Sequence, residues 1–547
     1  MLFHTPVFIL GFLPVCLLGF FLLGRWGGAV WALRWLLGCS LVFYGWWDAG
    51  LVPLLLGSVV GNWALGCWIA SVEDRRGRWL FGFGVAANLA LLGWFKYAGF
   101  VWGMVAPGSP ALEIVLPLAI SFFTFQQIMA LADCIPPPPW RGRAGVGGRC
   151  GTDGGRETPL SGTASAGQEG FAGDPGASTP PPVLGPLRGP SPQGEGARGG
   201  TDRGPTLLSH AVFVAFFPHL IAGPLVRPRE IIPQLTAPDL ATPRADNLST
   251  GLTIFLLGLA KKLVLADPFG SFADTGFDAA ARGETLSFFE AWCALLAYAL
   301  QIYFDFSGYS DMAIGLARMF NIRFPLNFDN PYQARSIAEF WHRWHITLGL
   351  FLRDFVYIPL GGSQRGPPRQ IAALLATMLL CGLWHGAAWR FVVWGGVHGA
   401  FLCIHALYRR LGPELPGPVA WALTLLAVVL AWVPFRAADL PTAWAFLVAL
   451  TGANGITLPA MIVGFIPGLS LIADPVPVLP FLGDARTLSF PEVTACLVLG
   501  WAIVLIPPNL HRWGEPRRLW AVTAAFAFTI QALFFAPNVA PFLYFQF

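Results

Sequence analysis

Charged residues are scarce in this chain of 547 residues. Asp, Glu, Lys and Arg make up 12% of the sequence, whereas a soluble domain usually carries about 25%. Hydrophobic residues make up 55%, and a water-soluble protein of this length would need far more polar surface. Complete disorder is excluded as well, because 23 Trp and 45 Phe supply ample apolar area to bury. The composition therefore predicts a multi-pass membrane protein.

Several chemical signatures are missing too. The nine cysteines form no CxxC pair and no zinc framework, so no metal site is expected. The sequence has neither a GxSxG nucleophile elbow nor a GxxxxGK[ST] phosphate loop. The net charge is only +4, and the basic residues lie in short scattered clusters. These clusters fit cytoplasmic loops or anionic headgroups better than a nucleic-acid interface, so no nucleic-acid partner is expected.

Long apolar runs supply the expected spans. The first follows a start without Lys or Arg, so we interpret it as a retained span rather than a signal peptide. Several runs are shorter than a full span, which predicts an all-α multi-pass protein with roughly 10–13 spans plus interfacial or re-entrant helices. The runs lie near residues 7–24, 28–46, 51–71, 79–100, 113–132, 208–226, 250–266, 286–304, 371–388, 390–407, 417–435, 440–451, 490–508 and 519–536.

One segment departs from this pattern. Residues 136–205 contain 19 Gly and 13 Pro among 70 residues. Such a segment cannot bury enough apolar area to offset its ordering entropy, which predicts a disordered insertion. It separates N-terminal membrane helices, 1–135, from a core with C-terminal membrane helices, 206–547. An inert insertion is the simpler interpretation, and a regulatory or partner-binding loop is the alternative.

The least lipid-like part of the remaining chain is residues 303–365, which begins with two carboxylates at the end of an apolar run. Ionisable groups at membrane depth are costly and usually face a cavity or a partner. Asp305 and Asp311 therefore either line a polar cavity or mark the end of a span, with Asp311 capping or pairing locally.

A helix is predicted further along this part. Ser336 and Glu339 have the spacing of a capping box, and the helix is expected to continue to Asp354. His342 and His345 would then share one helical face. A second pair of ligands is missing, so pairing with acids or a structural role is the better interpretation of His342 than a metal.

His385 lies in the apolar stretch 371–407. Its pKa near neutrality suits a general base, and Gly382 and Gly386 allow a close neighbour or leave space for a substrate. The alternative is a histidine bonded to a buried partner, for which His398 and His405 are better candidates.

Three stretches carry a resemblance that covers nearly the whole chain outside the insertion. They are FDFSGYSDMAIGLARMFNIRFPLNFDNPY, SIAEFWHRWHITLGLFLRDFVYIPLGGS and LLCGLWHGAAWRFVVWGGVHG, supported by LPLAISFFTFQ, FPHLIAGPLVRPREIIPQL and the terminal PFLYFQF. Together they resemble the membrane-bound O-acyltransferase family, and within it the bacterial alginate O-acetyltransferase membrane proteins. One departure is the insertion itself, which replaces a short loop with a Tyr-Arg pattern.

The resemblance implies a ring-like helical bundle with a central tunnel between a cytoplasmic donor side and an outer acceptor side. His385 matches the family's Trp-His-Gly histidine, and His345 matches the RWH histidine, so both are expected to be catalytic. His385 would accept the proton of a sugar hydroxyl that attacks the thioester of acetyl-CoA, the probable donor. The weaker donor-binding candidates are Arg343, Arg353, Asp305 and Asp311.

The resemblance also implies a location and partners. The protein would lie in the bacterial inner membrane and serve O-acetylation of an exopolysaccharide such as alginate, directly or through periplasmic partner acetyltransferases. No bound cofactor is expected. The alternatives are peptidoglycan or cellulose as acceptor, D-alanyl transfer, and a transporter or scaffold without catalysis.

Overall fold

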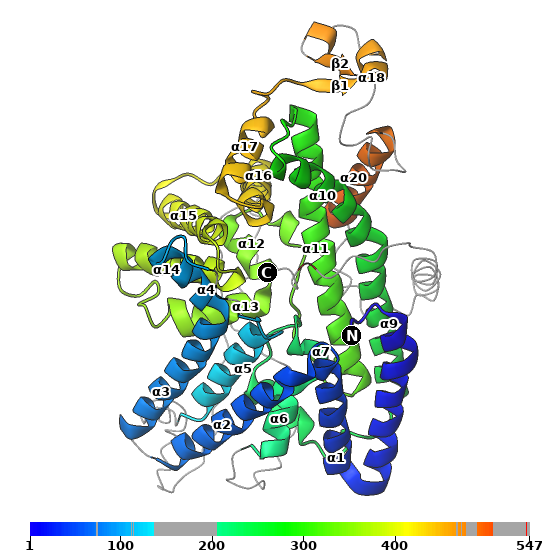
Figure 1. Cartoon of the computed structure of the whole chain (residues 1–547), viewed down its shortest axis with the longest axis vertical. Helices are drawn as coiled ribbons and strands as arrows, with labels where there is room; N and C mark the ends of the chain where they lie inside the picture. Colours follow the sequence, from blue (N-terminus) through cyan, green and yellow to red (C-terminus); the bar gives the residue numbers. More distant parts are fainter. Residues whose placement is uncertain are drawn as a thin grey trace, which may run out of the picture. The chain divides into compact units, whose positions relative to one another are not determined.

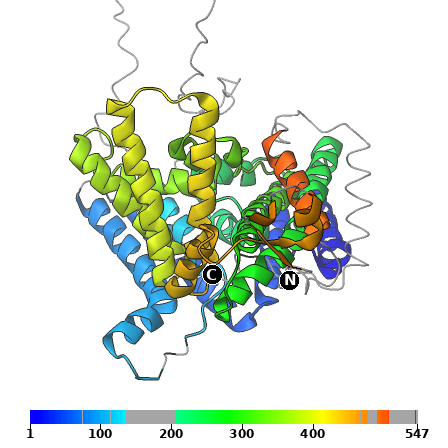
Figure 2. The same cartoon turned by 90° about the horizontal axis from the view of Figure 1, so that it is seen from above.

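The structure is a computed structural model of the chain (Figures 1 and 2). The predicted insertion lies outside the described residues except for Pro205, and so does the span expected near 519–536. The described residues are 1–72, 75–110, 112, 114–135, 205–465, 469–471, 473–476, 490–506 and 543.

The prediction of an all-α multi-pass membrane protein is confirmed. The described part consists of helices and one short parallel strand pair. Six of its helical segments are long and apolar enough to cross a membrane, fewer than the 10–13 spans expected. The remaining expected runs correspond to shorter helices, to more polar helices or to residues outside the described part. The six segments are Val7–Gly45, Ala49–Ser71, Arg75–Val105, Ala245–Ala281, Trp389–Leu411 and Gly417–Arg436.

The first segment is divided at Gly28, whose φ of 72° is left-handed and suits glycine. This break separates the two apolar runs predicted at 7–24 and 28–46. The two halves contact each other, because the Trp35 Nε1 donates a hydrogen bond to the Cys16 carbonyl at 3.1 Å.

The N-terminal helices α2, α3 and α5 pack side by side (Figure 1). The two described ends that flank residues 136–204 both meet α2. Trp63 Nε1 donates to the Pro205 carbonyl at 2.9 Å, and Gly66, one turn further, lies against Cys134. The elements up to this point are η1 (Val7–Phe12), α1 (Leu13–Gly45), η2 (Ala49–Leu51), α2 (Val52–Ser71), α3 (Arg75–Leu92), η3 (Gly93–Tyr97), α4 (Ala98–Val105), α5 (Ile120–Asp133), α6 (Leu207–Ala215), α7 (Phe217–Leu220) and α8 (Pro228–Leu235).

A long central helix, α11, packs against α9 (Figure 1). Two glycines seven residues apart on each helix face each other, Gly251 with Gly315 and Gly258 with Gly308. A Cβ at Gly251 or Gly258 would meet the facing glycine carbonyl at 2.6 Å. Small residues of this kind let membrane helices approach closely. The elements here are α9 (Ala245–Ala260), η4 (Lys261–Ala266), α10 (Asp267–Ala281), α11 (Phe288–Met319), η5 (Pro331–Gln333), α12 (Ile337–Arg343), α13 (Ile346–Leu352) and η6 (Arg353–Tyr357).

A second close helix pair, α14 with α15, carries His385. A Cβ at Gly382 would lie 2.1 Å from the Phe391 carbonyl, so only glycine permits this approach, as the sequence led us to expect. The remaining elements are α14 (Pro367–His385), α15 (Trp389–Leu411), α16 (Gly417–Arg436), α17 (Leu440–Leu450), β1 (Thr457–Pro459), α18 (Ala460–Phe465), η7 (Leu469–Leu471), β2 (Asp474–Val476) and α20 (Phe490–Leu505).

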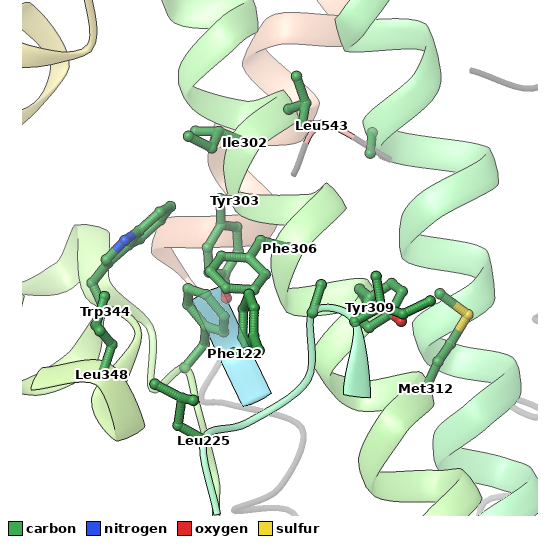
Figure 3. Packing of buried hydrophobic residues seen from close by; sticks show 14 of the residues in the cluster. Phe122, Leu225, Ile302, Tyr303, Phe306, Tyr309, Met312, Trp344, Leu348 and Leu543 are labelled. Atoms are coloured by element: carbon green, nitrogen blue, oxygen red, sulfur yellow. The ribbon is translucent and has the colours of Figure 1, made fainter. Parts of the chain in front are cut away.

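An aromatic core joins these parts. Figure 3 shows the rings of Tyr303 and Phe306, from α11, in one cluster with Phe122 and Trp344. The Phe306 ring also meets the His345 ring edge-on, with centroids 4.7 Å apart. The core therefore extends directly to one of the predicted catalytic histidines.

Candidate active site

His385 is the last residue of α14, and its side chain is buried. The chain leaves the helix at Gly386, where a Cβ would meet the Phe391 ring at 2.2 Å. The imidazole packs edge-on against Trp394 and Phe435, with ring centroids 5.1 and 5.2 Å away. Two aromatic rings thus pack against the predicted general base.

His345 occupies a break between two short helices. Ser336 caps α12 as predicted, since its hydroxyl accepts from the Glu339 N–H at 3.1 Å. The helix expected to run on to Asp354 instead ends at Arg343, and α13 starts after His345, whose φ is 44°. The expectation of one continuous helix was wrong, and His342 and His345 share no helical face.

Asn327 holds this break in place. Its side-chain oxygen accepts from the Thr347 hydroxyl at 2.9 Å and the Thr347 N–H at 3.3 Å, and His345 Nδ1 lies 3.2 Å from the same oxygen. A backbone N–H can only donate, so the shared atom is an acceptor and His345 Nδ1 carries a proton. In the neutral ring, Nε2 is then the basic nitrogen. Asn327 was not among the site residues predicted from the sequence.

One indole links the two predicted catalytic histidines. The Trp384 ring lies 4.8 Å from the His385 ring and 6.2 Å from the His345 ring, measured between centroids. The structure therefore brings together two residues that are 40 positions apart in the sequence.

A small cavity of about 180 Å³ opens at His385. Its wall includes Trp384, Lys96, Ser121 and Ala119, which has an unusual φ of 67° for a residue with a Cβ. Drug-sized ligands occupy roughly 300–1,000 Å³, so this cavity suits only a small reacting group.

Lys96 was not among the predicted site residues, although a lysine inside the apolar run 79–100 is itself a sign of a functional role. Its ammonium donates to the Trp384 carbonyl and to the Ser121 hydroxyl, the latter at 3.3 Å. The neighbouring Tyr97 hydroxyl donates to the Leu383 carbonyl at 2.8 Å. The last carbonyls of a helix have no partner within the helix, so η3 caps the end of α14 that carries His385.

A larger cavity of about 640 Å³ lies along the other part of α14, bordered by α12, α13 and α15. Its wall carries Arg353, one of the residues predicted to bind the donor, together with Arg409 and Arg410, which were not among the predicted site residues. Arg343 is not among its lining residues and pairs with Glu339 at 2.6 Å. The cavity wall therefore carries three arginines.

Arg353 belongs to a small ion cluster outside the candidate spans. Its Nε lies 2.7 Å from Asp354, which also pairs with Arg227. Partial burial alone would raise the pKa of the Asp354 carboxyl, but the hydrogen bonds and charges of the two arginines hold that pKa below its usual value.

Asp305 and Asp311 take part in ion pairs between α11 and η4. Lys262 lies 2.7 Å from both Asp305 and Asp267, and Lys261 lies 2.6 Å from Asp311. Asp305 also accepts from the Leu543 N–H at 2.9 Å, and Leu543 lies next to α11 in Figure 3. Neither Asp305 nor Asp311 lines either cavity, so their predicted role in donor binding stays a prediction without a supporting contact.

Comparison with known proteins identifies the relatives of this chain. The profile of the membrane-bound O-acyltransferase family matches residues 199–432. A peptidoglycan O-acetyltransferase of Helicobacter pylori is 38% identical over 477 residues, covering 84% of this chain and 81% of the relative. A probable alginate O-acetylase of Pseudomonas aeruginosa is 36% identical over 457 residues, covering 81% and 74%.

The chain belongs to the membrane-bound O-acyltransferase family. The resemblance found in the sequence is thereby confirmed, and the protein is an O-acyltransferase enzyme. A teichoic acid D-alanyltransferase of Bacillus subtilis is a more distant relative, 26% identical over 229 residues, which cover 40% of this chain and 56% of the relative. The matched region contains His345, His385 and the larger cavity, whereas Lys96 lies outside it.

Proposed function

We propose that this enzyme transfers acetyl groups from acetyl-CoA to hydroxyl groups of an exopolysaccharide such as alginate, at the bacterial inner membrane. Transfer is direct or passes through periplasmic partner acetyltransferases. The observation that carries the proposal is the position of His385 at the end of α14. This helix borders the larger cavity, with its three arginines, and His385 itself lines the small cavity.

The larger cavity supports a nucleotide-bearing donor. Its volume falls within the range of roughly 300–1,000 Å³ for small-molecule sites. Guanidinium groups bind phosphates through paired N–H donors, and Arg353, Arg409 and Arg410 supply three of them. Met378, in the cavity wall, precedes His385 by about 10 Å of helix. The pantetheine arm of acetyl-CoA is long enough to bridge that distance.

The smaller cavity supports the chemistry. The neutral His385 imidazole accepts the hydroxyl proton as the hydroxyl oxygen attacks the acyl carbon, and later returns that proton to the departing CoA thiolate. His345 would help to orient His385, because both imidazoles lie against the Trp384 indole. Asn327 fixes the tautomer and the ring position of His345.

The choice of acceptor is supported by the names of two relatives. One is named a probable alginate O-acetylase and another a peptidoglycan O-acetyltransferase, and they match most of the chain at 36% and 38% identity. Alginate-type polymers are our proposal, and peptidoglycan is the alternative.

The test is polymer-bound acetate, measured by proton NMR, in a deletion strain of the source bacterium. The strain is complemented with the wild type, with His385→Ala, or with His210→Gln at equal protein level. His210 is a matched control, because it is a buried histidine that bonds Gln127 at 3.0 Å and lines neither cavity.

Wild type and His210→Gln should restore acetate, and His385→Ala should not. Restoration by His385→Ala would contradict the catalytic role and favour a scaffold. A transporter would instead change solute flux without any dependence on a thioester.

A further inference from the structure

The chain contains only three lysines, and all three lie in π-helical segments: Lys96 in η3, and Lys261 and Lys262 in η4. Short π-helical segments within helices occur frequently at functional sites. Both segments also lie within candidate membrane spans, where a charged side chain is costly and usually functional. The three lysines are therefore candidates for a role beyond packing.

Their charge partners differ. Lys261 and Lys262 are neutralised by carboxylates at 2.6–2.7 Å. Among the described residues, the groups that contact Lys96 are neutral: it donates to oxygens of Trp384 and Ser121, and its ammonium lies 5.9 Å from the centre of the Trp384 ring. No carboxylate of the described residues forms an ion pair with it. An ammonium without a counter-charge, in the wall of a cavity, is suited to receive negative charge from a ligand or a transition state.

The cavity in question is the one that contains His385. Lys96 donates to the carbonyl of the residue directly before His385, and both Lys96 and His385 line this cavity. Ser121, which accepts from Lys96, lines the same cavity. Two of the three ammonium protons are engaged, and one is left for a third acceptor.

We propose that Lys96 is a catalytic residue that binds the acyl oxygen and stabilises the negative charge it acquires during transfer. The proposal rests on the proposed function. It assigns a role to a residue that lies outside the region matched by the family profile.

The transfer forms one C–O bond and breaks the C–S bond of the thioester. The acceptor hydroxyl oxygen forms a bond to the acyl carbon of the thioester, its proton passes to His385, and the carbonyl π electrons move to the acyl oxygen. That oxyanion takes the third hydrogen bond of Lys96. When the carbonyl re-forms, the C–S bond breaks, and the thiolate takes the proton from His385.

A purely structural role is the competing explanation, because Lys96 and Tyr97 both cap carbonyls at the end of α14. Two variants separate the roles. Lys96→Gln removes the charge and keeps a side-chain N–H donor for the Trp384 carbonyl. Tyr97→Phe removes a cap from the adjacent Leu383 carbonyl and keeps the charge.

The readout is the initial rate of label transfer from radiolabelled acetyl-CoA into the polymer fraction of permeabilised cells, so that any periplasmic partner is present. Lys96→Gln should lower the maximal rate roughly 10²–10³-fold, with little change in the KM for acetyl-CoA, because the lost interaction forms only in the transition state. Tyr97→Phe should stay within a few-fold of the wild type.

Equal losses in the two variants, or near-normal transfer by Lys96→Gln, would overturn the proposal. If Lys96→Gln does not yield monodisperse protein, Lys96→Arg decides: transfer within tenfold of the wild type supports the proposal, and a loss as complete as that of His385→Ala overturns it. The proposed function fails separately, when wild type and His385→Ala transfer label equally.

Discussion

Lys96 in η3 and the lysine pair in η4 place the same side chain in the same kind of helical irregularity, with opposite surroundings. The η4 lysines pair with Asp305 and Asp311 of α11, and these ion pairs hold α11 against the continuous helical segment formed by α9, η4 and α10. Lys262 also pairs with Asp267, at the start of α10. Lys96 faces a helix end and a cavity. Within this membrane domain, a neutralised lysine joins helices, whereas a lysine without a counter-charge marks a site that takes negative charge.

Breaking the η4 network should have the largest effect on stability. Lys262→Met leaves Asp305, which is 1% exposed, without its ion-pair partner. Removing one member of a buried pair costs about 3–5 kcal/mol. We expect a large drop in thermal unfolding temperature in detergent, and partial recovery when Asp305→Asn is added. Lys96→Gln, which strands no carboxylate, should lower the unfolding temperature less; an equal loss would remove the contrast between the two segments.

Separating α9 from α11 should weaken the same network indirectly. A side chain at Gly258 would meet the Gly308 carbonyl at 2.6 Å and Asp311 Cβ at 3.0 Å. Gly258→Val should destabilise by about 1–3 kcal/mol through overpacking. Gly61 is the matched control, because it lies within a membrane helix and a Cβ there meets nothing within 4 Å. Unfolding temperatures that fall equally for Gly258→Val and Gly61→Val would contradict this interpretation.

In the larger cavity, a substitution should affect donor binding rather than stability. Arg410→Ala removes a guanidinium from its wall. We expect the KM for acetyl-CoA to rise roughly 5- to 20-fold with little change in the maximal rate, since a charge-assisted hydrogen bond contributes about 1.5–3 kcal/mol when fully formed and part of this is screened by solvent. Arg34→Ala, in α1, is the control. An unchanged KM for Arg410→Ala would exclude this wall from donor binding.

The smallest effect is expected at η6, another π-helical segment, in which Arg353 and Asp354 form an ion pair. Because the Asp354 pKa is lowered, its ion pairs stabilise the fold at neutral pH, and this stabilisation is lost as the pH falls below the ordinary value of 3.8. Asp354→Asn should therefore cost at most about 1 kcal/mol at pH 7. The difference from wild type in unfolding temperature should disappear in acid, where Asp354 is protonated. A difference that grows in acid would contradict a stabilising role of these ion pairs.

The sequence predicted what depends on local pattern or on shared motifs. It indicated the all-α membrane fold, the Ser336 cap, the close approach at Gly382 and the family. It failed where the deciding contact comes from a residue that is distant in the sequence. The break at His345 depends on Asn327, 18 residues earlier, and the cap on α14 comes from Lys96, 288 residues before Trp384. Local periodicity cannot reveal a helix end that a distant side chain satisfies, so Lys96 appeared only once the fold was known.

The most direct measurement is the initial rate of label transfer from acetyl-CoA to polymer for wild type and His385→Ala in permeabilised cells at equal protein level. A general base contributes roughly 10²–10⁴-fold. We therefore expect the variant to fall by at least about 10²-fold while its unfolding temperature stays close to that of the wild type. Transfer by His385→Ala at the wild-type rate would contradict the assignment of this cavity as the site of acyl transfer.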